Sequence, residues 1–221
     1  MTSRWPLLFS TTLFLFSNSA FADSSLADVQ EIMQSMNRAY AGATTYRDDG
    51  VVLQREGSPI EFSYQFVRPN FLRFSWRYKS LFGLIDGLSV VRSDGRESST
   101  CRAPPLWLTD CRKEEGLVMA MAGATGVSHA TTLFRLLTRE SGGFPINQLE
   151  GLVLVGKDLV EGTDCYRVAG NHPRGFGKYE VWIGTSDFLI RKIKDDRDEE
   201  IHRNIVINTD IPAATFRPAK T

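Results

Sequence analysis

Apolar and polar residues alternate with a period of two along two neighbouring segments of the chain. In the first, Phe62, Tyr64 and Phe66 are separated by polar residues, and after a turn at Pro69 and Asn70 the alternation resumes with Leu72, Phe74, Trp76 and Tyr78. Such alternation predicts two half-buried strands paired antiparallel. Because the apolar side chains of each strand share one face, the pair would present a dense aromatic band to one side of a sheet.

Upstream of these strands the apolar residues follow helical spacing instead. One stripe contains Leu26, Val29, Ile32, Met33, Met36 and Tyr40, with Ser24 or Ser25 as a candidate N-cap and Gly42 as a stop. This pattern predicts an amphipathic helix that packs against another element. Two shorter helices are predicted within residues 114–140, of which the better supported runs from His129 to Thr138 and contains Leu133, Phe134 and Leu137.

Strand patterns also occur at several other places in the chain. They cover residues 46–56, 88–91, 152–159, 163–169, 178–184, 188–194 and 201–208. The charged segment from Lys194 to Glu200 lies between two of these patterns, and we interpret it as a solvated turn. The order helix, strands, two helices, strands predicts an α+β domain in which one antiparallel sheet carries its helices on one face.

The N-terminus has the pattern of a secretory signal. Arg4 is followed by a short apolar run, which ends in the small-residue site Ala20-Phe21-Ala22. This order predicts a signal peptide over residues 1–22, cleaved after Ala22, and a periplasmic single domain over residues 23–221. The alternative is an N-terminal membrane anchor. The apolar run is broken by Ser and Thr and is shorter than the roughly 20 residues that span a bilayer.

Charge and motifs exclude several classes of function. The chain has 26 basic and 26 acidic residues, so it lacks the basic excess that nucleic-acid binding requires. It has no glycine-rich phosphate loop, no nucleophile elbow and no H-E-x-x-H motif.

His129, His172 and His202 lie in different predicted elements, and we interpret them as surface or cap residues. Asp48 and Asp49 form, with Gly50, a predicted bend or bulge near the start of the strand over residues 46–56, and Asp favours such positions. We therefore predict no catalytic residue, metal or cofactor.

Three cysteines bear on the redox state of the protein. Cys101 and Cys111 flank a short segment, whereas Cys165 lies in an alternating apolar run. Three pairings are possible, and the short segment favours a disulfide between Cys101 and Cys111 in an oxidising compartment. Cys165 is then expected to be a buried, unreactive thiol.

The aromatic band admits two interpretations. It could be ordinary core under the helices, or it could line a partly filled apolar cavity between sheet and helices. Composition alone does not separate these interpretations, because both use the same residues.

Several segments together resemble the LolA/LolB-like superfamily of periplasmic lipoprotein-localisation factors. They are the signal and helix, the segment from Phe66 to Phe74 with its Arg68-Pro69, the turn Ser93–Arg96, the strand Tyr179–Ile183 and the closing segment Asn208–Phe216. The similarity covers nearly all of the chain after the signal. The chain departs from LolA in its Cys101–Cys111 segment and from LolB in having no lipobox.

The resemblance implies a curved, unclosed antiparallel half-barrel with an N-terminal helix and two short helices as a lid on its concave face. It also implies a cavity that receives lipid or the acyl chains of a lipoprotein. The lining residues would be Phe62, Tyr64, Phe66, Leu72, Phe74 and Trp76, with Leu133, Phe134 and Leu137 in the lid. We therefore expect a monomeric, non-catalytic carrier that meets a membrane-bound donor or acceptor protein. The alternatives are a module that docks a protein partner on its concave face, or an enzyme on the same scaffold.

Overall fold

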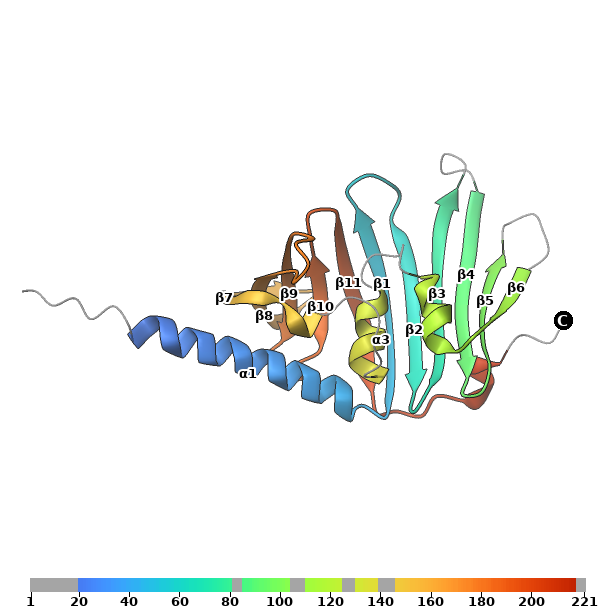
Figure 1. Cartoon of the computed structure of the whole chain (residues 1–221), viewed down its shortest axis with the longest axis horizontal. Helices are drawn as coiled ribbons and strands as arrows, with labels where there is room; N and C mark the ends of the chain where they lie inside the picture. Colours follow the sequence, from blue (N-terminus) through green and yellow to red (C-terminus); the bar gives the residue numbers. More distant parts are fainter. Residues whose placement is uncertain (1–19, 81–84, 104–109, 125–129, 139–145, 218–221) are drawn as a thin grey trace, which may run out of the picture.

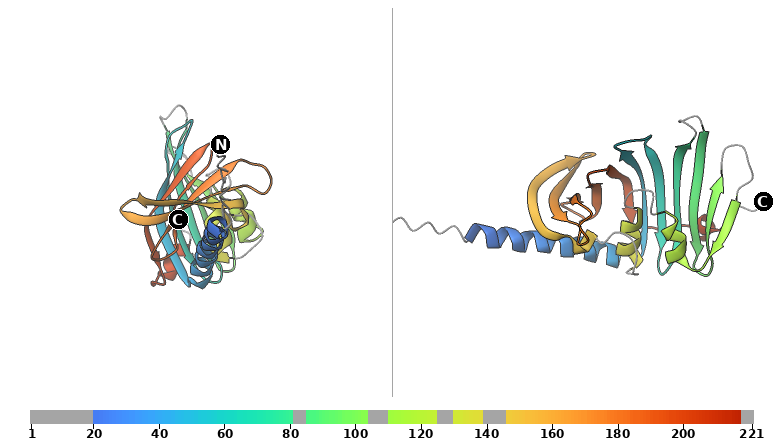
Figure 2. Two further views of the ribbon diagram at one scale, coloured as in Figure 1. Left: turned by 90° about the vertical axis from the view of Figure 1, so that its left-hand side faces the viewer. Right: turned by 45° about the horizontal axis from the view of Figure 1, so that its top comes forward.

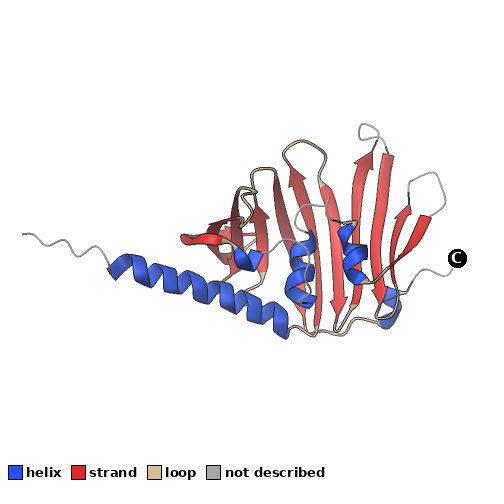
Figure 3. Cartoon of the chain, in the orientation of Figure 1, coloured by secondary structure: helices blue, strands red, loops and turns tan. Residues whose placement is uncertain are grey.

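The computed structural model describes residues 20–80, 85–103, 110–124, 130–138 and 146–217. Within these residues, eleven strands form one antiparallel sheet (Figures 1 and 3). The strands are β1 (Thr45–Gln54), β2 (Ile60–Val67), β3 (Phe71–Ser80), β4 (Ile85–Asp94), β5 (Ser98–Ala103), β6 (Asp110–Glu114), β7 (Glu150–Val160), β8 (Thr163–Asn171), β9 (Lys178–Gly184), β10 (Ile190–Lys194) and β11 (Asp198–Ile207). The helices are α1 (Ala20–Gly42), α2 (Leu117–Ala122) and α3 (Ala130–Thr138), with 3-10 turns η1 (Ile146–Gln148) and η2 (Ala213–Phe216).

The sheet is curved and unclosed. Its order is β6-β5-β4-β3-β2-β1-β11-β10-β9-β8-β7, so β6 and β7 are the two ends. Figure 2 shows the β7–β8 end curling around α1. Helix α1 packs against β7 and α3, and α2 packs against β4 and β5. This arrangement confirms the predicted α+β half-barrel with helices on its concave face, which we call the helix-covered face.

Helix α1 is stabilised by the packing of its apolar stripe against β7 and α3. Val29, Ile32, Met33, Met36 and Tyr40 are all buried, as their spacing predicts. The C-terminal end of the helix is fixed by Arg68, whose guanidinium donates hydrogen bonds to the carbonyls of Tyr40, Ala41 and Ala43. A cation at this end also complements the helix dipole. Tyr40 in turn accepts a hydrogen bond from the amide of Ile190 at 3.0 Å, which ties α1 to β10.

The two halves of the chain meet in the middle of the sheet. Strand β1 pairs with β2 on one side and with β11 on the other. This pairing places Gly50 directly opposite both Phe62 and His202. Gly50 is required at this point, because a Cβ atom there would lie 2.1 Å from the Phe62 ring and 2.4 Å from the carbonyl oxygen of Ile201.

The cysteines behave as the sequence predicts. Cys101 and Cys111 form a disulfide between directly paired residues of β5 and β6. Cys165 is a buried free thiol, and burial raises its pKa to about 11, which suppresses the reactive thiolate.

Two predictions fall on residues that the structure does not describe. Residues 1–19 of the predicted signal peptide and His129 lie outside the described ranges, and the description begins with α1 at Ala20. None of the described helices combines the length and apolar character that a membrane-spanning helix requires.

Candidate functional site

The helix-covered face of β2 and β3 is an aromatic band. Its six predicted lining residues are each at most 8% exposed: Phe62, Tyr64, Phe66, Leu72, Phe74 and Trp76. The strand register joins them in direct cross-strand pairs, Tyr64 with Phe74 for example. The Phe74 ring stacks on Trp76 at 5.1 Å between centroids and lies 5.6 Å from Tyr64. The rings therefore form one continuous apolar surface.

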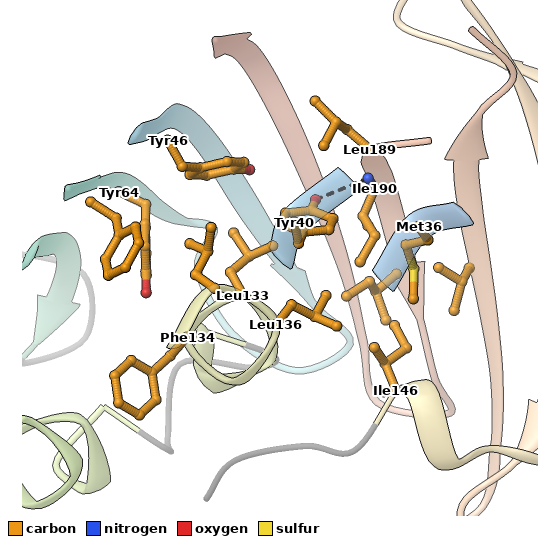
Figure 4. Close-up of a cluster of buried hydrophobic side chains, with 14 of the residues drawn as sticks. Met36, Tyr40, Tyr46, Tyr64, Leu133, Phe134, Leu136, Ile146, Leu189 and Ile190 are labelled. Carbon is orange, nitrogen blue, oxygen red and sulfur yellow. Dashed lines mark hydrogen bonds between the residues drawn. The ribbon is translucent and has the colours of Figure 1, made fainter. Parts of the chain in front are cut away.

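Helix α3 covers this band. Its residues Leu133, Phe134 and Leu137 are each at most 1% exposed. Figure 4 shows Leu133 and Phe134 beside Tyr64, with Leu136 directed towards Tyr40 and Ile146. The structure thus gathers all nine predicted residues into one apolar cluster. Their role in binding a ligand stays a prediction.

A buried polar cluster interrupts the same face between β1 and β11. His202 Nδ1 lies 2.7 Å from Asp48 Oδ2, and His202 Nε2 lies 3.0 Å from Glu200 Oε1. The Tyr46 hydroxyl donates a second hydrogen bond to Asp48 Oδ2 at 2.9 Å. All four residues are at most 1% exposed. We call Asp48, Glu200 and His202 the buried triad.

The geometry of the buried triad favours a protonated histidine. Burial is the largest single influence and would lower the pKa of His202, but the polar contacts with Asp48 and Glu200 and the charges of these two residues together raise the pKa to about 9. Burial raises the pKa of Asp48, while the hydrogen bonds from His202 and Tyr46 oppose that rise. Burial also holds the pKa of Tyr46 well above its usual value. At neutral pH the triad is therefore an imidazolium between two carboxyl groups.

A β-bulge in β11 positions the triad. Arg47 pairs with Val206 and Asp49 pairs with Arg203, so β11 contains one extra residue opposite Asp48. Asn204 in this bulge has a φ of 52°, in the left-handed region that Asn tolerates better than most residues. The bulge reverses the alternation of β11. As a result His202 and Glu200 share the helix-covered face with Ile205 and Ile207, which pack against the core.

The triad corrects three interpretations made from the sequence. His202 is a core residue rather than a surface or cap residue, and Asp48 is buried within β1 rather than at a bend. The segment Lys194–Glu200 does contain a turn, but Glu200 is buried in β11. His172 is also buried, and it acts locally by accepting a hydrogen bond from the Arg174 amide. Ile201, Ile205 and Ile207 keep the spacing of a regular strand across Asn204, so the alternation of β11 does not predict the bulge.

Some buried polar atoms on this face have no hydrogen-bond partner within the described part of the chain. They are the Tyr64 hydroxyl, the Thr132 hydroxyl, Asp48 Oδ1 and His202 Nε2, which lies 3.0 Å from Glu200 Oε1 as an ion pair without the alignment of a hydrogen bond. Tyr64 belongs to the aromatic band and Thr132 to α3, so two of these atoms lie where sheet and helix meet. Such atoms are costly in an apolar interior and are satisfied by a bound water or a polar group of a ligand. In the described residues no cluster of three or more His, Cys, Asp or Glu has the arrangement of a metal site.

The chain is similar in fold to several solved structures, at low sequence identity. The LprF protein from Mycobacterium bovis has a TM-score of 0.53 at 12% identity, with 85% of this chain and 96% of that chain covered. The similarity to LprF is one of fold, an unclosed antiparallel half-barrel. A LolA superfamily protein, NE2245 from Nitrosomonas europaea, has a TM-score of 0.31 at 9% identity, covering 86% of this chain and 97% of that one.

A third structure is the complex of MucA and MucB from Pseudomonas aeruginosa. Its TM-score is 0.44 at 13% identity, and the match covers 87% of this chain but 61% of that chain. No family model and no curated protein sequence matches this chain. The similarity to LprF therefore supports the half-barrel architecture, and a fold alone does not determine function.

Proposed function

We propose that the protein is a periplasmic carrier that binds a lipid or the acyl chain of a lipoprotein between the aromatic band and α3. The active form would comprise residues 23–221 after cleavage at Ala22, and it would act as a monomer without catalysis or a cofactor. A membrane-bound donor or acceptor protein would load or unload it.

The observation that carries this proposal is the way α3 covers the band. The strands beneath it hold their own ladders of hydrogen bonds. Helix α3 meets them with leucine and phenylalanine side chains, whose packing is not directional. Displacing α3 therefore breaks no strand pairing, and an acyl chain could replace its apolar contacts.

The energetics of this exchange are adequate. Each buried methylene contributes about 0.8 kcal/mol. Micromolar affinity corresponds to about 8 kcal/mol, so some ten methylenes supply that amount before the costs of association. A long acyl chain exceeds this number.

A pair of opposite substitutions at one position tests the site. Leu133→Trp fills the interface between α3 and the band, and we expect it to weaken uptake of a fluorescent C16 fatty acid at least tenfold. Leu133→Ala adds space there and should retain or tighten uptake. Leu159→Trp is the matched control, because Leu159 is 64% exposed on β7. Circular dichroism would confirm that each variant is folded.

Two results would count against the proposal. If the wild-type protein takes up no probe at micromolar concentration, the carrier function is wrong. If all three variants bind the probe equally, the ligand lies elsewhere. A single protein co-purifying in stoichiometric amount without lipid would instead favour the alternative, a module that docks a protein partner.

The buried triad does not favour the enzyme alternative. A carboxyl group and a histidine that both have perturbed pKa values are typical of catalytic sites. Here each imidazole nitrogen faces a carboxyl group within 3.0 Å, so neither is directed at a substrate. The triad is better explained as a structural link between β1 and β11.

A further inference from the structure

The face of the sheet opposite α1, α2 and α3, which we call the open face, carries a row of basic residues. The 3-10 turn η2 packs on part of this face, where Phe216 contacts Phe71 of β3. The register aligns Arg47, Gln65, Arg73, Arg92, Ser99 and Lys113 as direct neighbours across β1 to β6. Arg73 and Arg92 are thus two like charges directly opposite one another. Such pairs destabilise a sheet, because the side chains of facing residues lie close together.

Neighbouring carboxylates do not relieve this repulsion. Within the described residues no salt bridge joins Arg73 or Arg92 to an acidic group, and the Nε atom of Arg92 is buried without a hydrogen-bond partner. Acidic groups on the neighbouring strands have other neighbours. Glu61 on β2 lies directly opposite Arg77 on β3. Asp94 accepts hydrogen bonds from the amides of Arg96 and Glu97, and Glu97 pairs with Lys113 at 2.7 Å.

A hollow adjoins Arg73. It has a volume of about 310 Å³, and Arg73 and Arg77 line it together with the hydroxyl-bearing residues Ser63 and Ser75 and one carboxylate, that of Glu61. Arg92 lies beside it, directly opposite Arg73 on β4. Burial and the charge of Arg73 both lower the pKa of Arg92, which agrees with a close approach of the two guanidinium groups. The charged lining of the hollow is therefore two guanidinium groups against one carboxylate, and Ser63 and Ser75 add hydrogen-bond donors.

We propose that Arg73 and Arg92 form a binding site for a phosphate-class oxyanion on the open face. A guanidinium presents paired N–H donors that match the oxygens of phosphate. Neighbouring strands are about 4.8 Å apart, so one tetrahedral anion can contact both side chains. The anion would remove the repulsion between them. Free phosphate and the phosphate of a lipid headgroup share this chemistry.

Thermal unfolding in two buffers tests the site. Sodium phosphate and sodium chloride would be compared at pH 7 and equal ionic strength, for the wild type, R73Q, R92Q and the double variant. We expect phosphate to raise the Tm of the wild type and to leave that of the double variant unchanged. In chloride, each single variant should unfold at the same temperature as the wild type or higher, because the repulsion is gone.

Arg203→Gln is the matched control. Arg203 lies on the open face of β11, and it already pairs with Glu161 at 2.8 Å. The R203Q variant removes the same charge and should keep the full response to phosphate. If it loses the response as the double variant does, the effect is general screening and the site is refuted. No response in the wild type to phosphate or to lipid phosphate would also refute it.

Vesicle sedimentation distinguishes the two sources of phosphate. Vesicles of phosphatidylglycerol in phosphatidylcholine would be compared with phosphatidylcholine alone. Binding to the anionic vesicles that falls at least tenfold in the double variant assigns the site to a lipid headgroup. A response to phosphate without vesicle binding assigns it to a free anion. Equal vesicle binding by wild type and double variant, together with an equal response to phosphate, overturns the proposal.

Discussion

The helix-covered face contains two regions that are buried to the same degree but held together differently. Around β2, β3 and α3 the contacts are aromatic and aliphatic, and they depend on shape and area. Around β1 and β11 the contacts are charged and directional, between Asp48, His202 and Glu200. Apolar contacts can be exchanged for those of another apolar group, whereas a buried charge needs its specific partner. We infer that the first region can admit a ligand and that the second fixes the sheet.

We expect the largest loss of stability when the histidine that pairs with the two buried carboxyl groups is removed. His202→Leu leaves Asp48 and Glu200 buried without a counter-ion. We expect a loss of about 3–5 kcal/mol in the free energy of unfolding, measured by urea denaturation. The triple variant D48L/E200L/H202L removes all three polar groups and should recover part of that loss. A triple variant less stable than H202L would show that the triad itself is not the cause.

In the aromatic region, shortening a buried side chain should destabilise the protein, and a bound fatty acid should restore part of the lost stability. Leu133→Ala removes fully buried apolar contacts and should cost about 2–5 kcal/mol. A saturating C16 fatty acid should raise the stability of L133A more than that of the wild type, because the added space takes part of the chain. The same fatty acid should leave the deficit of H202L unchanged. Equal rescue of both variants would contradict the division into two regions.

The stability of the charged region should depend on pH in the alkaline range. The pKa of His202 is raised from its unfolded value of 6.5 to about 9. Its contribution is therefore present in full below pH 6.5 and is lost as the pH rises through about 9, a change of about 3 kcal/mol. Burial lowers the pKa of His172, so its ring should titrate below 6.5. NMR of the histidine ring protons would separate the two, and a His202 ring that is neutral at pH 7 would contradict the account.

The smallest effect concerns the bulge that positions the triad. Asn204→Gly retains a residue suited to a φ of 52° and should change stability by less than about 1 kcal/mol. Asn204→Val places a β-branched residue in that conformation and should cost about 1–3 kcal/mol. Thermal unfolding of the two variants measures the difference. Equal stability would mean that β11 tolerates another register.

The sequence predicts the aromatic region well and the charged region poorly, for a physical reason. Alternation places Phe62, Tyr64 and Phe66 on one face of β2, and Leu72, Phe74 and Trp76 on one face of β3. These two sets form a single face of the sheet because β2 and β3 pair without a register shift. Helical spacing likewise identifies α1 and the buried residues of α3. The bulge at Asn204 breaks the alternation of β11, so Ile201 and Ile205 lie on opposite faces although they are four residues apart. The pairing of β1 with β11, which joins Asp48 to His202, depends on contacts across the whole chain.

Native mass spectrometry of the protein, purified gently from a periplasmic extract, tests the central claim most directly. The account predicts a bound species of lipid mass, one per protein, that is lost on organic extraction and regained on incubation with lipid vesicles. A protein that has its apo mass both as purified and after incubation with vesicles would contradict the account. The aromatic band would then be core alone.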